Sequence, residues 1–293
     1  MTHSWLSGLA LVGAFTLAAP VAQTHVLCTG FVKKNDLYIP ANTHAKGGIT
    51  KDDFNSVLDR IQEVYGPIIS AHGGTLQINR LWDDGTVNAS AEEHGNTWVL
   101  NMYGGLARYP TMTKDGFAMV ACHETGHHLG GAPKIQSYFG SDWASNEGEA
   151  DYFASLRCMR NIFTDADNAK FVAENTIDAT LMAKCQQLFT TQEERNLCLR
   201  EGMAGFVGAK TFQDLGKEQT APAFSTPDMN KVDQTDDEHP ATQCRLDTYY
   251  AGSVCVHDRT VELSNSDYKV GTCTEATGKT DGVRPHCWFS PSN

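Results

Sequence analysis

The 293-residue sequence has no run of lysine or arginine, no obvious internal repeat and no long disordered tract. Its net charge is -12, from 23 basic and 35 acidic residues. A phosphate backbone would repel a chain this acidic, so we expect no nucleic acid partner. Hydrophobic residues make up 41% and charged residues 20% of the chain, which is typical of a globular protein. The length suits one large domain or two small ones.

Charged side chains are also missing from the first hydrophobic stretch, Trp5 to Ala22, which has no Asp, Glu, Lys or Arg. The stretch ends in Ala-Ala-Pro-Val-Ala, small residues of the kind that signal peptidases cut. A membrane anchor is the alternative, but about 18 residues is at the short limit for a span. We predict a signal peptide over residues 1–22 and an exported protein, periplasmic or secreted. No other run approaches the length of a transmembrane helix, so we expect no stable membrane span once the signal is removed.

CxxC pairs, a common metal-binding arrangement, are absent although the chain has nine cysteines. So many cysteines without such pairs favour disulfides and an oxidising compartment. The spacing suggests a loop closed by Cys185 and Cys198, and a disulfide-rich tail over about residues 244–293. The tail cysteines are Cys244, Cys255, Cys273 and Cys287. The odd number leaves one thiol unpaired, and Cys122 is the candidate because it lies inside the helix that carries the main motif.

Helical and strand patterns alternate in the first half of the chain. Thr50 and Asp53 form a capping box that opens a helix, and Gly66-Pro67 weakens that helix near its end. We predict strands over residues 75–82 and 96–103, helices over 113–129 and 146–163, and more helix between 167 and 212. A loop over 217–238 and short strands in the tail complete the pattern. We predict a single α+β domain over residues 23–293, mainly helical with a small β-sheet.

His123-Glu124-Thr125-Gly126-His127 is an HExxH motif. Two histidines four residues apart lie on one face of a helix, where both imidazoles can reach one Zn²⁺. Glu124 lies beside them without ligating, so it can take a proton from water and act as the general base. HExxH also arises by chance, so its surroundings must decide. Here it ends an amphipathic helix that follows a strand, as the chemistry requires.

A catalytic zinc takes three protein ligands and keeps one position open. The last position of the longer HExxHxxGxxH pattern is Pro133, which cannot bind a metal. His128 points about 100° away from the preceding histidine around the helix. Glu147 remains, with Asp151 on the same helical face four residues later. We predict that Glu147 ligates the zinc and that Asp151 accepts the distal N–H of a zinc-bound histidine, with Glu149 facing elsewhere. The alternative is an acidic helix start that only complements the helix dipole.

The run from Gly105 to His127 resembles the active-site helix of the gluzincin metallopeptidases of the HtpX, BepA and CAAX prenyl protease type. Residues 147–151, Glu-Gly-Glu-Ala-Asp, are similar to the ExxAD segment of that family. His239-Pro240, with Arg245 six residues after the histidine, is similar to its HP segment. The resemblance covers about half the chain. It implies a zincin-like fold with one Zn²⁺ per chain, in which His239 steadies the oxyanion or donates a proton and Arg245 supports His239.

The strand over residues 97–103 leads towards the motif helix. In the resembling proteins such a strand is an edge that pairs with an extended substrate, although Trp98 and Leu100 also fit a plain core strand. We therefore predict a zinc-dependent endopeptidase that acts on protein or peptide substrates.

Two other functions stay open at this point. A thermolysin-like peptidase would share every site residue except His239 and Arg245. A non-catalytic, metal-stabilised secreted quality-control binder is the alternative outside enzymes. Glu124 argues against that binder, because a structural zinc needs no base.

Overall fold

The computed structural model describes Met1 and residues 30–42, 47–135, 143–164 and 166–291. The predicted signal peptide, apart from Met1, lies outside these residues, and so does Cys28. Among the described residues, no helix is both long and apolar enough to cross a membrane. The fold mixes helices with one small sheet, as predicted.

Three strands form the sheet: β1 (Thr75–Leu81), β2 (Ala89–His94) and β3 (Thr97–Tyr103). Their order is β1-β3-β2, with β1 parallel and β2 antiparallel to β3. The prediction that β3 is an edge strand is therefore wrong, because it is hydrogen-bonded on both sides. Leu100 and Met102 of β3 are buried in the main core, which agrees with the alternative of a core strand.

The first helix, α1 (Lys51–Ala71), begins with the predicted capping box of Thr50 and Asp53. It continues through Pro67 to Ala71. Pro67 is exposed, whereas Tyr65 and Ile69 on either side of it are buried. Burial of that face holds the last turn in place despite the missing backbone donor.

The helix that carries the motif is α3 (Lys114–Leu129), which lies within the predicted range 113–129, and its N-cap is Thr113. The predicted helix over 146–163 is α4 (Glu147–Phe153), a π-helical turn η1 (Ala154–Cys158) and α5 (Met159–Ile162) in succession. The remaining helical elements are α2 (Gly104–Ala107), α6 (Asn168–Glu174), α7 (Ala179–Leu188), α8 (Gln192–Gly216), α9 (Thr242–Val254) and η2 (Glu275–Thr277).

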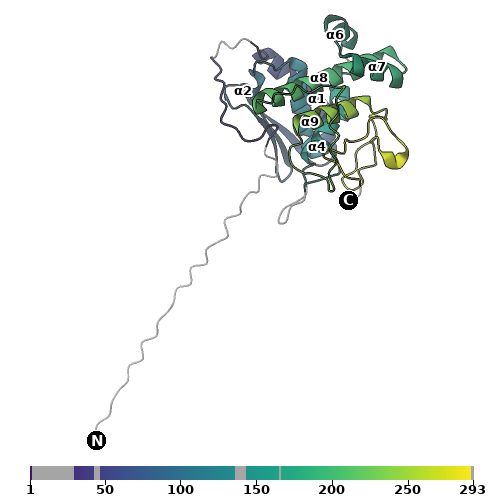
Figure 1. The fold of residues 1–293 in the computed structure, drawn as a ribbon. Coiled ribbons are helices and arrows are strands. Elements are labelled where there is room, and N and C mark those ends of the chain that lie inside the picture. The colour runs from purple at the N-terminus through teal and green to yellow at the C-terminus, as the bar shows by residue number, and fades with distance from the viewer. Residues whose placement is uncertain (2–29, 43–46, 136–142, 165, 292–293) are drawn as a thin grey trace.

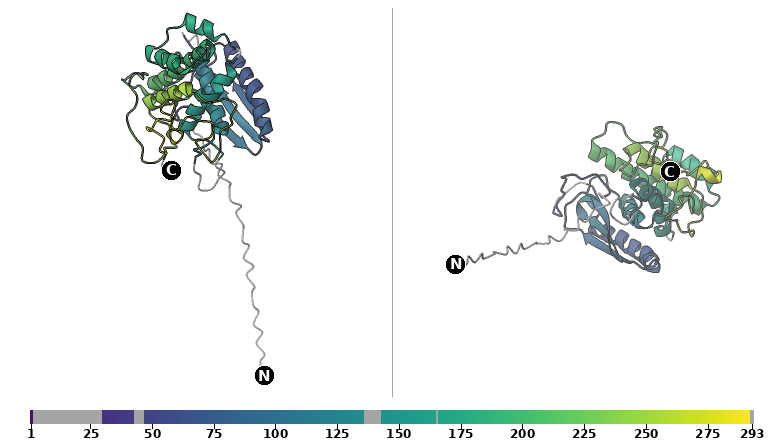
Figure 2. Two further views of the ribbon diagram at one scale, coloured as in Figure 1. Left: turned by 90° about the vertical axis from the view of Figure 1, so that its right-hand side faces the viewer. Right: turned by 90° about the horizontal axis from the view of Figure 1, so that it is seen from below.

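The second half of the chain wraps around α4. Figure 1 shows α8 beside α9, and the yellow C-terminal segment close to α4. Figure 2 shows the blue strands and the blue helix on one side of the molecule and the green and yellow segments on the other. The predicted short strands of the tail are wrong: its described residues hold α9, η2 and loops. Helix α9 forms there because its buried face packs against α8 and α4.

Four disulfides join eight of the nine cysteines. Cys185 pairs with Cys198 as predicted, and the tail cysteines pair among themselves, Cys244 with Cys287 and Cys255 with Cys273. The prediction that Cys122 is free is wrong, because it is bonded to Cys158. Packing of α3 against the π-helical turn brings the two Cα atoms to 5.4 Å, a distance that a disulfide spans.

Removing the disulfide between α3 and the π-helical turn should lower the stability of the fold. Cys122→Ala/Cys158→Ala is expected to lower the free energy of unfolding by about 2–4 kcal/mol, because a denatured chain without the bond gains entropy. Guanidinium unfolding measures this loss. Cys185→Ala/Cys198→Ala is the control, since it opens a loop of 13 rather than 36 residues and should cost less. A larger loss in the control would contradict the argument.

Candidate metal centre

The two motif histidines are held in the same way. Each forms a hydrogen bond at Nδ1, so the Nε2 atoms are the ones that face the candidate metal site. His123 Nδ1 lies 2.6 Å from Asp151 Oδ1, and His127 Nδ1 lies 2.9 Å from the Ser145 carbonyl oxygen. Both partners are acceptors, so each Nδ1 carries a proton, and in the neutral imidazole that a metal requires each Nε2 would keep its lone pair. Metal-binding histidines in proteins are oriented in the same way.

Glu147 completes the group. Its Oε2 lies 3.2 Å from His123 Nε2, and its Oε1 lies 3.8 Å from His127 Nε2. A tetrahedral zinc with bonds of about 2.0–2.1 Å holds its ligand atoms about 3.3 Å apart. Burial raises the pKa of Glu147, but His127 and His123 outweigh it and hold the pKa at about 2. The three side chains are buried and form a group that could bind a metal ion, so the residues fit the predicted zinc.

A close approach of two helices places Glu147. A Cβ at Gly126 of the motif would lie 2.9 Å from Ala150 Cα, so a glycine lets α4 pack directly on α3. Asn146 caps α4 by accepting a hydrogen bond from the Glu149 backbone N–H at 2.9 Å. The amide of Asn146 also donates to Asp237, which lies in the segment that leads to the HP motif.

Asp151 lies at the centre of a buried polar cluster. It accepts two hydrogen bonds of 2.7 Å from the Arg245 guanidinium and one of 2.6 Å from the Tyr249 hydroxyl, besides its contact with His123. Burial raises the pKa of Asp151, but Arg245 and His123 outweigh it and hold the pKa well below its usual range. Asp151 therefore stays charged and fixes the orientation of the His123 ring, which is the geometry predicted for it.

Arg245 differs from its expected role. Besides Asp151, its guanidinium donates to the Phe31 carbonyl oxygen at 2.9 Å. It makes no hydrogen bond to His239 among the described residues, and it instead holds Asp151, which orients the His123 ring.

His239 nevertheless lies at the site, far as it is from the motif in sequence. Its Nε2 lies 2.7 Å from the Gly30 carbonyl oxygen and 3.4 Å from Glu147 Oε2. Burial lowers the pKa of His239. The His239 ring thus lies next to Glu147, and its hydrogen bond to the Gly30 carbonyl oxygen fixes its position.

Glu124 is fully buried, and neither of its carboxylate oxygens has a hydrogen-bond partner among the described residues. Burial raises its pKa, since the charged form is poorly solvated there. Burying a carboxylate without a hydrogen-bond partner costs free energy, so its presence calls for an explanation such as a functional role. The observation fits a base whose natural partner is a water or a substrate.

Glu149 faces away from the ligands, as predicted. Its carboxylate is bound by Arg284 from the C-terminal tail, with Arg284 Nη2 at 2.7 Å. The Trp288 ring packs against Gly148, where a Cβ would lie 2.2 Å from the ring. The tail therefore covers the side of α4 that is turned away from the candidate metal ligands. His128 is also outside the ligand group.

The sequence reasoning missed three supporting groups: Tyr249, the Ser145 carbonyl and the segment around Phe31. Only Tyr249 had a readable signal, because it follows Arg245 by four residues and so shares its helical face. The Phe31 ring lies edge-on to His123 at 5.2 Å, a contact that no local pattern indicates.

A scan against protein-family models found no match, and searches of the curated proteins and of the solved structures found none either.

Proposed function

We propose that this chain is a zinc-dependent endopeptidase of the gluzincin type. The observation that carries the proposal is the buried, unpartnered carboxylate of Glu124 beside the group formed by His123, His127 and Glu147. A Zn²⁺ ion bound there would lower the pKa of a water molecule and polarise a carbonyl oxygen.

The chain's own residues account for the proton transfers. Glu124 accepts a proton from the attacking water at a carboxylate oxygen and delivers it to the nitrogen of the departing amine. The Nε2–H of His239, which donates to the Gly30 carbonyl oxygen in this structure, would turn to donate a hydrogen bond towards the negative charge that develops on the substrate carbonyl oxygen. Asp151 and Arg245 keep the His123 ring in one orientation throughout the cycle.

An extended peptide substrate is better placed along the outer edge of β2 than along β3, because β3 is paired on both sides. One end of β2 is occupied, because the Phe31 backbone N–H donates to the Ala89 carbonyl at 2.9 Å. Beyond Ala89, the outer edge of β2 makes no backbone hydrogen bond to any residue in the described ranges. Helix α3 packs against β2, so an extended peptide paired with that edge would run beside the ligand group.

The purified mature protein provides the main test. We expect about one zinc per chain, hydrolysis of fluorogenic casein, loss of hydrolysis with a chelator and its return on adding zinc. Zinc bound at full occupancy without hydrolysis of casein or of a random peptide library would favour the non-catalytic binder. Amino-terminal sequencing of the same preparation checks for cleavage after Ala22, as expected of an exported chain.

Removing His239 should affect the chemical step. His239→Ala is expected to lower kcat about 10²–10³-fold, with zinc still bound and KM little changed, because the contact forms mainly in the transition state. Steady-state kinetics with metal analysis measures both effects. His239→Gln keeps an N–H donor and should recover part of the loss. Activity of His239→Ala within about threefold of wild type would exclude this role of His239 and leave the thermolysin-like alternative.

A further inference from the structure

The candidate metal site is closed to solvent in this structure. His123, Glu124 and His127 are fully buried, and Glu147 is only 3% exposed. A substrate carbonyl and an attacking water molecule must both reach these side chains. Part of the chain that surrounds them must therefore give way before the proposed peptidase can act.

The peptide unit between Gly30 and Phe31 lies on groups that the proposed mechanism assigns to a substrate. Its carbonyl oxygen, on Gly30, accepts a hydrogen bond of 2.7 Å from His239 Nε2, the proposed donor to the oxyanion. Its N–H, on Phe31, donates to the Ala89 carbonyl oxygen of β2 at 2.9 Å. The Phe31 ring lies edge-on to the candidate ligand His123 at 5.2 Å. One peptide unit thus occupies both the edge of β2 and the donor that a substrate needs.

The backbone of Gly30 does not have the conformation of a substrate. Its φ is +95°, which side-chain-bearing residues rarely adopt, and a Cβ there would lie 2.5 Å from the Ala89 carbonyl oxygen. Peptides that pair with the edge of a sheet are extended and have negative φ. The unit therefore makes the hydrogen bonds of a substrate without its backbone shape, which favours an inhibitor over a site of self-cleavage.

The residues that follow Gly30 hold the unit in place. Arg245 donates to the Phe31 carbonyl oxygen at 2.9 Å, and the Phe31 ring is fully buried. Asn88 Oδ1 accepts a hydrogen bond of 3.0 Å from the Val32 N–H, and the Asn88 amide donates to the Val32 carbonyl oxygen at 3.2 Å. Rotation of the Gly30–Phe31 peptide plane alone would release His239 and Ala89 together and leave these anchors intact.

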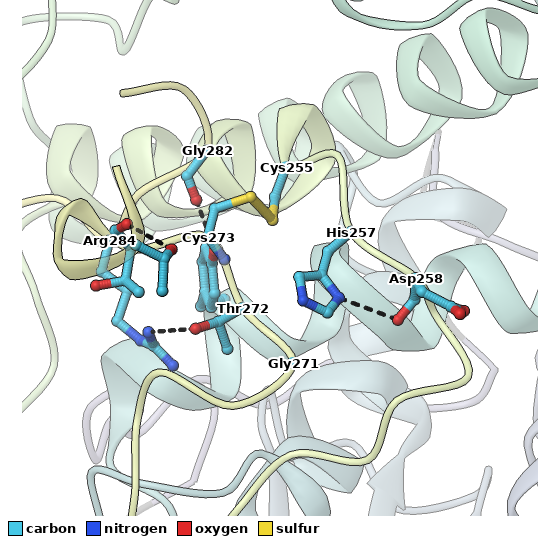
Figure 3. Close-up of a disulfide and its surroundings, with 12 residues drawn as sticks. Cys255, His257, Asp258, Gly271, Thr272, Cys273, Gly282 and Arg284 are labelled. Carbon is cyan, nitrogen blue, oxygen red and sulfur yellow. Dashed lines mark hydrogen bonds between the residues drawn. A yellow bond between two sulfur atoms is a disulfide. The ribbon is translucent and has the colours of Figure 1, made fainter. Parts of the chain in front are cut away.

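The other side of α4 is covered in a different way. Figure 3 shows the tail beside the Cys255–Cys273 disulfide, where Arg284 donates to the Thr272 hydroxyl at 3.3 Å. Residues 30–42 contain no cysteine, so hydrogen bonds and packing hold the start of this segment. A hydrogen bond contributes little net free energy. The Gly30–Phe31 unit can therefore be displaced by a competing peptide, whereas the disulfide cannot.

We propose that the Gly30–Phe31 unit inhibits the proposed peptidase by holding the place of a substrate peptide bond, until a peptide that pairs with β2 displaces it. The inference rests on the proposed function, because that function assigns His239 and the edge of β2 to the substrate. Only a fraction of the molecules is open at any time. The apparent affinity for substrate falls by that fraction, while open molecules turn over at the full rate.

Gly30→Ala in the full mature chain tests the inhibition, because its Cβ clashes with Ala89 and drives the carbonyl away from His239. With a fluorogenic casein peptide we expect KM to be about three- to tenfold lower and kcat little changed. A carbonyl that only orients His239 would give the reverse, a lower kcat with KM unchanged. Gly278→Ala is the matched control, since Gly278 also has a positive φ, +76°, but a Cβ there meets nothing within 4 Å.

Asn88→Ala loosens the same segment without introducing a clash. It should lower KM in the same direction as Gly30→Ala, by a smaller factor, because it removes the hydrogen bonds to Val32. Asn35→Ala is its control, since the Asn35 amide binds the Lys33 and Val87 carbonyl oxygens further along the chain. Thermal unfolding verifies that all four variants are folded.

Hydrogen exchange at the Phe31 amide reports displacement without turnover. In zinc-loaded Glu124→Gln, the same casein peptide should speed this exchange at least about tenfold, because it breaks the hydrogen bond to Ala89. Unchanged exchange with the peptide bound, or an unchanged KM in Gly30→Ala, would overturn the inhibition and leave the proposed function intact. So would Phe31 as a new amino terminus of the zinc-loaded wild type. An absence of hydrolysis in every variant would overturn the proposed function itself.

Discussion

Glu124→Gln is expected to lower kcat about 10²–10⁴-fold while zinc stays bound, because an amide cannot accept the proton that a general base removes. Neither oxygen of Glu124 has a hydrogen-bond partner among the described residues, so the exchange breaks no contact with the protein. It also removes a buried charge. The melting temperature should therefore stay the same or rise while activity is lost.

Glu201→Gln is the matched control for this variant. Glu201 is equally buried, but it pairs with Arg160, away from the ligand group. Its loss should lower stability and leave kcat near the wild-type value, the reverse of the pattern at Glu124. Kinetics, metal analysis and thermal unfolding of the two variants together separate the roles. Near-normal hydrolysis by Glu124→Gln would exclude Glu124 as the base.

Glu147→Ala is expected to remove most of the bound zinc, because two histidines alone hold the ion weakly. Asp151→Asn should weaken zinc binding about 10–100-fold, since it disturbs the orientation of the His123 ring. It should also destabilise the fold, because it leaves the buried Arg245 cation without its carboxylate. Titration against a chromophoric chelator measures these affinities.

Glu149→Gln is the control for both substitutions. Glu149 lies on the same turn of α4, but its carboxylate is bound to Arg284. Zinc affinity should therefore remain near the wild-type value, and the free energy of unfolding should fall. Loss of zinc in Glu149→Gln with retention in Glu147→Ala would show that the helix presents the other face to the metal.

Much of the site could be predicted from sequence because its central residues come from two short segments, each read within one helical turn. The HExxH spacing and the spacing of Glu147 and Asp151 are both one helical turn, so one face of each helix carries both groups. The structure brings these four side chains together as expected. The capping box at the start of α1 was readable for the same reason.

The features that could not be predicted depend on contacts between residues that are far apart in the sequence. Strand β2, Ala-Ser-Ala-Glu-Glu-His, has no β-branched or aromatic residue and forms only because β3 lies beside it. Cys122 looked unpaired because nothing in the sequence says that α3 packs against Cys158. Arg284 and Trp288 come from a tail without periodic pattern, so their contacts with α4 could not be foreseen.

Arg245 joins Asp151, 94 residues away, to Phe31, 214 residues away, within one hydrogen-bonded cluster. Contacts between such distant segments form late, because closing long loops costs chain entropy first. A growing chain already contains the histidines of α3 long before α9 supplies the cation that holds Asp151. For the proposed peptidase, assembly in this order would delay full activity until α9 has been synthesised, which would protect the cell that makes the enzyme.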